Sequence, residues 1–319
     1  MHRITKILVL VIAMAAMGSI HAQQVPIFTN FENSYAVVNP GYYGMSEGVN
    51  ALGIYRNQWA GFKDQTTGDV VSPRTFFVSA DLPIKILRGG VGLSIMRDQI
   101  GFESNTAVNL GYSYHLDLGA GTLGLGLAFS FNNRSADFSK AKPLDDNDPV
   151  IPTSSQSDML MDFNFGAYYL VPETFYVGFS STNLLERKGK ALEGKSATSA
   201  SFVGDRTFYL MAGYEYQFLN PKFVLNPSMM LLSDIASTQF NVSARLWYNN
   251  KFCFGVNYRH KESVDLLVGF TVKGVNICYA YDINTMKLKL PGSHEVSISY
   301  CFKLDLERSP RIYRSIRYL

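Results

Sequence analysis

The sequence has few charged residues, few histidines and no long apolar run after its first 22 residues. Charged residues make up 17% of the 319 residues, and the mean hydropathy is +0.01. A transmembrane helix needs about 20 consecutive apolar residues, so none is expected beyond the N-terminus. The formal net charge of +3 gives no electrostatic reason to bind nucleic acid or another polyion. Apolar residues are still abundant, and because they form no long run they must be interspersed with polar ones.

Residues suited to metal binding or catalysis are scarce. The three cysteines, Cys253, Cys278 and Cys301, lack the spacing of a zinc or haem motif, and each lies between apolar residues. We expect them to be small interior side chains. The five histidines do not combine with a serine or an aspartate into a recognisable catalytic set. We therefore predict a protein that is not an enzyme and has no cofactor.

The first 22 residues predict a secretory signal peptide. Arg3 and Lys6 form its basic end, residues 7–17 its apolar core, and residues 18–22 a small-residue approach to cleavage before Gln23. Residues 23–48 contain prolines, glycines and several aromatics and show no strand-like alternation. We expect this N-terminal segment either to lie in the periplasm or to plug the lumen of the barrel inferred below.

Residues 106–132 show the pattern that recurs through the chain. Leu123, Leu125, Leu127, Phe129 and Phe131 alternate with small or polar residues, and residues 107–116 alternate in the same way. A period of two puts successive side chains on opposite faces of a strand. Strands of about ten residues with one apolar and one polar face are typical of membrane-spanning β-barrels.

Repetition of this pattern predicts an all-β fold: a transmembrane antiparallel β-barrel of about 14 strands, with an N-terminal non-strand segment. A soluble β-sandwich is the alternative for such a composition. The predicted strands span residues 49–59, 74–84, 90–96, 106–116, 122–132, 159–171, 174–183, 207–218, 223–232, 239–248, 252–259, 264–272, 275–281 and 295–302.

The connections between these strands fall into two classes. Those after the even strands are short, as at residues 119–121 and 273–274, whereas several after the odd strands are long and polar, as at 133–158 and 184–205. Outer-membrane barrels have short periplasmic turns and longer external loops. The pattern favours a barrel over a sandwich. It predicts an integral outer-membrane protein with both termini in the periplasm, composed of a barrel at 49–302 and a tail at 303–319.

Polar residues on faces that should point inward form a candidate network in the lumen. Charges of both signs in an interior partly closed to water tend to pair. The network either fills the lumen structurally or forms a polar path or ligand site. Its members are Arg56, Gln58, Asp162, Asn164, Glu215, Gln217, Arg245, Arg259, Asp265, Asp282 and Glu295.

The C-terminal tail is basic. Arg308, Arg311, Arg314 and Arg317 recur at every third position. Two interpretations remain open, a solvated tail and a docking peptide for a periplasmic partner.

A set of short motifs occurs in order over nearly the whole mature chain. The motifs are NPG at 39–41 with Gly44, YRNQWAGF at 55–62, DFNFGAY at 162–168, YVGFS at 176–180, NPS at 226–228, YR at 258–259, YAYD at 279–282 and SHEV at 293–296. They resemble motifs of the PorP/SprF outer-membrane proteins, and the ordered set is more specific than any one of them. Gly41 departs from the family, which more often has alanine after the Asn-Pro pair.

The resemblance implies a non-enzymatic component of the type IX secretion and gliding machinery of Bacteroidota. Its implied partners are the periplasmic ring lipoprotein, associated type IX components, outer-membrane lipid, and a secreted adhesin, protease or other cargo with a C-terminal secretion signal. The family has no established catalytic residues to carry over, and the particular client does not follow from membership. The alternative is an outer-membrane channel for small or apolar solutes, because the long-chain fatty-acid channel also holds an N-terminal segment inside fourteen strands.

Overall fold

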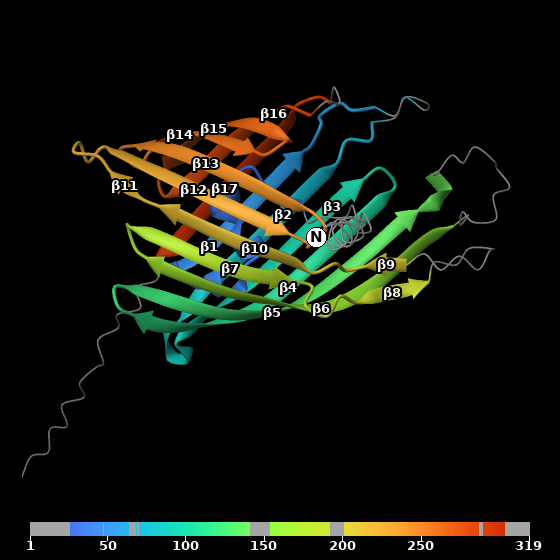
Figure 1. The fold of residues 1–319 in the computed structure, drawn as a ribbon, viewed down its shortest axis with the longest axis horizontal. Coiled ribbons are helices and arrows are strands. Elements are labelled where there is room, and N and C mark those ends of the chain that lie inside the picture. Colours follow the sequence, from blue (N-terminus) through green and yellow to red (C-terminus); the bar gives the residue numbers. More distant parts are fainter. Residues whose placement is uncertain are drawn as a thin grey trace, which may run out of the picture.

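The chain forms a closed antiparallel β-barrel of fourteen strands in the computed structural model (Figure 1). The structure describes residues 26–46, 48–63, 68, 70–140, 154–191, 201–286 and 290–303. The predicted signal peptide and most of the tail lie outside these residues. Each barrel strand pairs with its neighbours in the sequence, and the first strand pairs with the last.

The barrel strands follow one another around the sheet. They are β1 (Gly48–Asn57), β2 (Arg74–Ile84), β3 (Gly89–Ile100), β4 (Glu103–Leu118), β5 (Gly121–Asp137), β6 (Ser155–Val171), β7 (Phe175–Thr182), β10 (Thr207–Tyr214), β11 (Tyr216–Gln217), β12 (Phe223–Ser233), β13 (Thr238–Tyr248), β14 (Phe252–Arg259), β15 (Ser263–Val272), β16 (Val275–Asn284) and β17 (Ser293–Lys303). Both β10 and β11 pair with β12, so they act as one interrupted strand. Outside the barrel, β8 (Lys188–Ala191) and β9 (Ser201–Val203) pair with each other.

The alternation of apolar and polar residues sorts the two faces of the wall. On β14, Phe252, Phe254 and Val256 point outward and are exposed, whereas Cys253 and Asn257 point inward and are buried. The outer face is apolar because it meets lipid, and the inner face carries the polar groups. This difference is why the sequence pattern alone located all fourteen strands.

Several strands are longer than predicted, and the largest differences are in β3, β4, β5 and β6. The β5–β6 ladder continues to the pair Asp137–Ser155, beyond the apolar part of both strands. In this extension both faces are polar, so the alternation that marks a lipid-facing strand is lost although the backbone hydrogen bonds continue. β4 likewise begins at Glu103, three residues before the predicted start.

The two rims of the barrel differ in their connections. Turns at one rim, called the short-turn end, join β3 to β2, β5 to β4 and β14 to β13 within a few residues. At the β13–β14 turn, Asn249 and Asn250 have φ values of 54° and 53°, as a tight hairpin turn requires. The opposite rim, called the long-loop end, carries the connections after β1, β5 and β7, including the β8–β9 pair.

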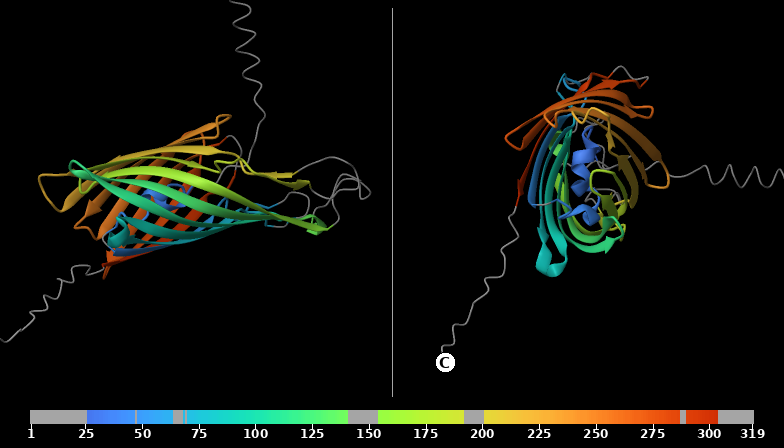
Figure 2. Two further views of the ribbon diagram at one scale, coloured as in Figure 1. Left: turned by 90° about the horizontal axis from the view of Figure 1, so that it is seen from below. Right: turned by 90° about the vertical axis from the view of Figure 1, so that its left-hand side faces the viewer.

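Residues 26–46 lie inside the barrel and not beside it. They form two short 3₁₀ helices, η1 (Phe31–Val37) and η2 (Pro40–Tyr42). Figure 2 shows these residues in blue, enclosed by the strands when the barrel is viewed along its length. Among the described residues, no helix is long and apolar enough to cross a membrane.

A charge on the outer face should destabilise the barrel according to its depth in the bilayer. Leu127, near the middle of β5, is 53% exposed. We expect Leu127→Arg to lower the free energy of unfolding in lipid vesicles by about 2–4 kcal/mol, measured by urea titration. Leu118→Arg, outward but at the end of β4, is the control and should cost about 0–1 kcal/mol. Equal losses at the two positions would contradict a bilayer centred on the middle of the strands.

Candidate functional site

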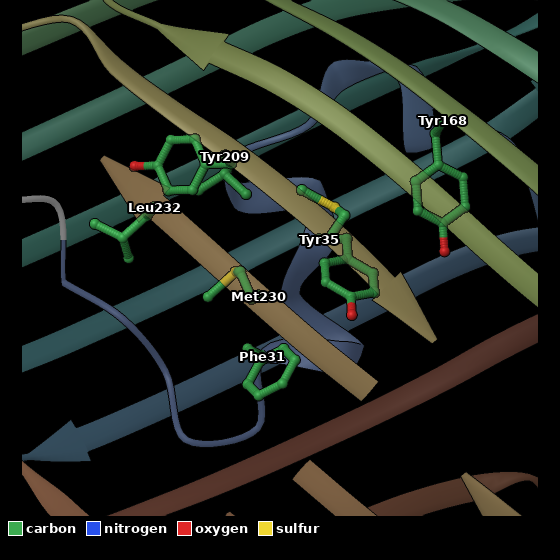
Figure 3. Packing of buried hydrophobic residues seen from close by; sticks show 8 residues of the cluster. Phe31, Tyr35, Tyr168, Tyr209, Met230 and Leu232 are labelled. Carbon is green, nitrogen blue, oxygen red and sulfur yellow. The ribbon is translucent and has the colours of Figure 1, made fainter. Parts of the chain in front are cut away.

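The lumen is occupied by the N-terminal segment, defined here as residues 26–46. Its apolar side chains Phe31, Tyr35 and Val38 pack against a cluster on the inner wall (Figure 3). The wall side of this cluster consists of Tyr168, Tyr209, Met211, Met230 and Leu232. Burying one such side chain contributes about 1.5–3 kcal/mol in water. An otherwise polar lumen therefore contains an apolar patch whose partner is the segment.

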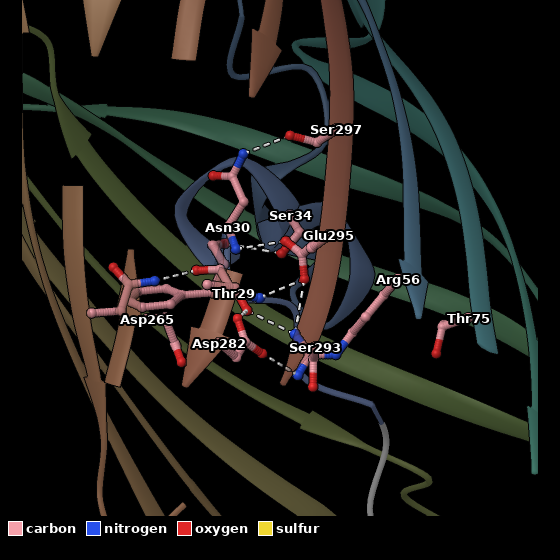
Figure 4. A network of polar contacts seen from close by, with 12 residues as sticks. Thr29, Asn30, Ser34, Arg56, Thr75, Asp265, Asp282, Ser293, Glu295 and Ser297 are labelled. Carbon is pink, nitrogen blue, oxygen red and sulfur yellow. Dashed lines mark hydrogen bonds and ion pairs between the residues drawn. The ribbon is translucent and has the colours of Figure 1, made fainter. Parts of the chain in front are cut away.

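Five residues toward the long-loop end form the anchor cluster: Thr29, Asn30, Arg56, Asp282 and Glu295 (Figure 4). Arg56 on β1 donates to Glu295 Oε2 at 3.0 Å and to Asp282 Oδ2 at 2.6 Å. Glu295 on β17 accepts the backbone N–H groups of Thr29 and Asn30 at 2.7 and 2.8 Å. The Thr29 hydroxyl accepts from Arg56 and donates to Asp282. The cluster ties the segment to β1, β16 and β17.

Every charge in the anchor cluster is buried. The side chains of Arg56, Asp282 and Glu295 are 2%, 3% and 1% exposed. Two carboxylates face one guanidinium, and N–H and hydroxyl groups of the segment supply further donors. Hydrogen bonds to ionised groups are about twice as strong as those between neutral groups. The carboxylates accept hydrogen bonds from both the wall and the segment. Without the segment they would lack some of their donors, and the segment would lack acceptors for its N–H groups.

Glu32 makes a second polar link. Its Oε1 lies 3.2 Å from Nε of Arg245, a β13 residue that is 2% exposed. The same oxygen accepts a hydrogen bond from the Ser228 hydroxyl on β12. The segment is thus held by charged groups on two sides of the lumen.

Residues 39–41 lie against glycines on the inner wall. Gly126 on β5 pairs with Gly166 on β6. A Cβ at Gly126 would lie 2.2 Å from the carbonyl carbon of Pro40, and one at Gly166 would lie 2.0 Å from Asn39 Oδ1. Asn39 Oδ1 accepts the N–H of Gly41 at 2.9 Å. The close approach explains why small residues occupy the inner face of this hairpin.

The predicted network divides into separate groups. Arg56, Asp282 and Glu295 are in the anchor cluster, and Arg245 holds Glu32. Arg259 donates to Glu262 at 3.0 Å and lies 4.0 Å from Asp265. These contacts are neighbours around the wall, not one continuous path.

Asp162 and Asn164 on β6 hold the loop after β7 instead. Asp162 Oδ1 accepts the backbone N–H of Leu185 at 2.8 Å, and Asn164 Oδ1 accepts that of Asn183 at 3.0 Å. They therefore brace the long-loop end.

Three predicted members do not lie on the inner faces of regular strands. Gln58 follows β1 and donates its backbone N–H to Pro73, and Glu215 lies at the break between β10 and β11. Gln217 is exposed. The prediction assumed a first strand reaching residue 59 and an unbroken strand over 207–218. Arg308, Arg311, Arg314 and Arg317 of the tail lie outside the described residues.

Sequence reasoning missed the segment's own contribution, namely Thr29, Asn30 and Glu32. Short 3₁₀ turns give no periodic signal, and apart from the Thr29–Arg56 hydrogen bond these contacts join residues more than 190 positions apart.

A cavity of about 190 Å³ lies at the long-loop end, above the segment. Amide and hydroxyl side chains, including Asn105, Asn109, Asn132 and Ser135, line it together with apolar and charged ones. Among the described residues, no group of histidine, cysteine, aspartate and glutamate is arranged to hold a metal ion. The cavity can therefore offer hydrogen bonds to a polar ligand.

The fold and the filled lumen define a membrane β-barrel that contains its own N-terminal segment. The model of the type IX secretion system membrane protein PorP/SprF family matches residues 20–300. The chain belongs to this family and is an integral outer-membrane protein.

Solved structures of outer-membrane barrels are similar in fold. The Ralstonia pickettii toluene transporter TbuX has 14% identity and a TM-score of 0.50, with 85% of this chain and 94% of that chain covered. A Pseudomonas aeruginosa FadL homologue has 11% identity and a TM-score of 0.48, with 86% and 95% covered. At these identities the likeness to TbuX concerns the fold alone. No curated protein matches the chain.

Removing the charge of Arg56 should destabilise the protein strongly. Arg56→Met leaves two buried carboxylates without their guanidinium, a type of change that costs about 3–5 kcal/mol. The free energy of unfolding is measured by urea titration in lipid vesicles. The control is Arg206→Met. The side chains of Arg206 and Glu186 are 36% and 51% exposed, so their ion pair should contribute about 0–1 kcal/mol. Similar losses for both variants would contradict the role given to the anchor cluster.

A side chain at Gly126 should displace the segment while leaving the barrel closed. The Cβ of Gly126→Ala would overlap the Pro40 backbone, whereas the Cβ of Gly53→Ala meets nothing closer than 3.8 Å. We expect chymotrypsin to cleave the segment several-fold faster in Gly126→Ala than in wild type, and at the wild-type rate in Gly53→Ala. Mass spectrometry of the fragments identifies the cut sites. An unchanged rate in Gly126→Ala would mean that the segment does not lie against this glycine.

Proposed function

We propose that this barrel is a non-enzymatic component of the type IX secretion and gliding machinery that helps to export cargo proteins or attach them to the cell surface. The observation that carries the proposal is the family match over residues 20–300. Residues of the family-like motifs also take part in the contacts between the segment and the barrel wall. They are Asn39 in the segment and Arg56, Gly166, Asp282 and Glu295 in the wall. The resemblance and the filled lumen thus concern the same residues.

The orientation that we propose places the short-turn end and both termini in the periplasm. This assignment follows the usual layout of outer-membrane barrels. The tail, with its four arginines, then faces the periplasmic ring lipoprotein and its associated components. The long-loop end carries the 190 Å³ cavity and the loop that Asp162 and Asn164 hold, and in this orientation it faces the cargo. Adhesins and secreted proteases are the candidate cargo proteins.

A solute channel is the second candidate function. Its support is the fold shared with the toluene transporter TbuX. The segment counts against it, because apolar packing and two sets of buried ion pairs hold residues 26–46 across the lumen. A channel would need this segment to move.

Deletion of the gene, with complementation in trans, tests the secretion proposal. Mass spectrometry of the medium and the cell surface should show loss of secreted proteins that carry the type IX C-terminal signal. Loss of many such proteins marks a core component, and loss of one adhesin marks a dedicated partner. Complementation with the wild-type gene is the control and should restore the secreted proteins. An unchanged set of secreted proteins, in a strain that also lacks any paralogues, would contradict the proposal.

A further inference from the structure

A second cavity, of about 260 Å³, lies at the short-turn end of the lumen. We call it the tyrosine pocket, because Tyr35, Tyr42, Tyr168 and Tyr176 line it together with Glu32. Two of these rings come from the N-terminal segment and two from β6 and β7. The cavity therefore exists only while the segment is seated in the barrel.

The four rings are held in a fixed arrangement. Tyr168 and Tyr176 stack with centroids 5.6 Å apart, and Tyr42 meets Tyr168 edge-on at 5.3 Å. The hydroxyls of Tyr35 and Tyr176 are hydrogen-bonded at 2.7 Å. Aromatic faces attract a guanidinium or ammonium group, most strongly where water is partly excluded.

Carboxylates make the surroundings of the pocket electronegative. Both recorded contacts of Glu32 use Oε1, so Oε2 has no partner among the described residues. Asp81 is buried and accepts from the Gly44 N–H and from Asn50, with no cation among its described contacts. Burial and the Asp81 charge both raise the pKa of the Tyr42 hydroxyl. Arg245 pairs with Glu32 Oε1, and neither Asp81 nor Glu32 Oε2 has a cation among its described contacts.

The end of β17, which the C-terminal tail follows in the sequence, lies near this pocket. Gly48 pairs with Lys303, the last residue of β17, and Ser46, two residues before Gly48, lines the pocket. The rim of the pocket is thus at most about 13 Å from Lys303, from the spacing of paired and consecutive Cα atoms. Five residues of extended chain reach about 17 Å, which brings Arg308 to the rim before its side chain is counted.

We propose that the tyrosine pocket binds an arginine side chain of this protein's own tail, with Arg308 the first in reach. The rings supply cation–π attraction, and Glu32 Oε2 supplies a hydrogen-bond acceptor for the guanidinium. Arg311, Arg314 and Arg317 follow at three-residue intervals, and each is a further arginine that the pocket can bind. This inference does not depend on the secretion proposal. If the tail also docks a periplasmic partner, that partner competes with the pocket.

A peptide-binding experiment in detergent tests the proposal with the full-length chain. The receptor carries Arg308→Gln, Arg311→Gln, Arg314→Gln and Arg317→Gln, which leaves the pocket without its own ligand. Fluorescence anisotropy follows a labelled peptide of residues 304–319. We expect binding to this receptor about tenfold tighter than to the wild-type chain, where the tail competes, and much weaker binding by a peptide with the four glutamines. Equal binding of the arginine and glutamine peptides would overturn the proposal.

Substitutions in the receptor locate the binding. Glu32→Gln and Tyr42→Leu, each added to the glutamine-tail receptor, should weaken binding of the arginine peptide about tenfold. Glu103→Gln, at the long-loop end, removes the same charge far from the pocket and should have no effect. A loss in all three receptors, or in none, would show a diffuse charge effect or another site and overturn the proposal. A scrambled peptide of equal charge that binds as tightly would also overturn the assignment to the tail.

Discussion

The ion pair between Arg56 and Glu295 is the interaction on which the rest of the structure depends. The two residues face each other across β1 and β17, the pair of strands that closes the barrel. Glu295 also receives the backbone N–H groups that precede η1. One buried carboxylate therefore fixes the register of closure and the position of the N-terminal segment. A shift of one strand by one residue relative to the other would turn one of these two charges toward lipid.

The segment and the wall satisfy each other's polar and apolar groups. The wall supplies Arg56, Arg245 and an apolar patch, and the segment supplies backbone donors, Glu32 and aromatic rings. The inner glycines let residues 39–41 approach the backbone of β5 and β6. Among the described residues, the larger cavities lie toward the two ends of the lumen: one is lined by polar and apolar side chains, and the other is the tyrosine pocket. The segment occupies the lumen between these two cavities.

The strands were predictable because lipid and lumen impose opposite chemistry on alternate residues, as on β14. Where both faces are polar, as at the far end of β5 and β6, the pattern fails. The three charged members of the anchor cluster, Arg56, Asp282 and Glu295, were predicted as polar residues on faces that should point inward. Their partners Thr29 and Asn30 were not, because irregular backbone carries no period and contacts across the whole chain leave no local trace. The hydrogen bonds from the loop after β7 to Asp162 and Asn164 could not be predicted either, because the backbone of that loop is also irregular.

Electrical recording in a planar bilayer tests the central claim, that the seated segment closes the lumen. The wild-type barrel should show no steady conductance. The variant lacking residues 23–48 should show a stable open level, and Arg56→Met should open intermittently as its segment loosens. Steady conductance of the wild-type protein, unchanged by the deletion, would contradict the account.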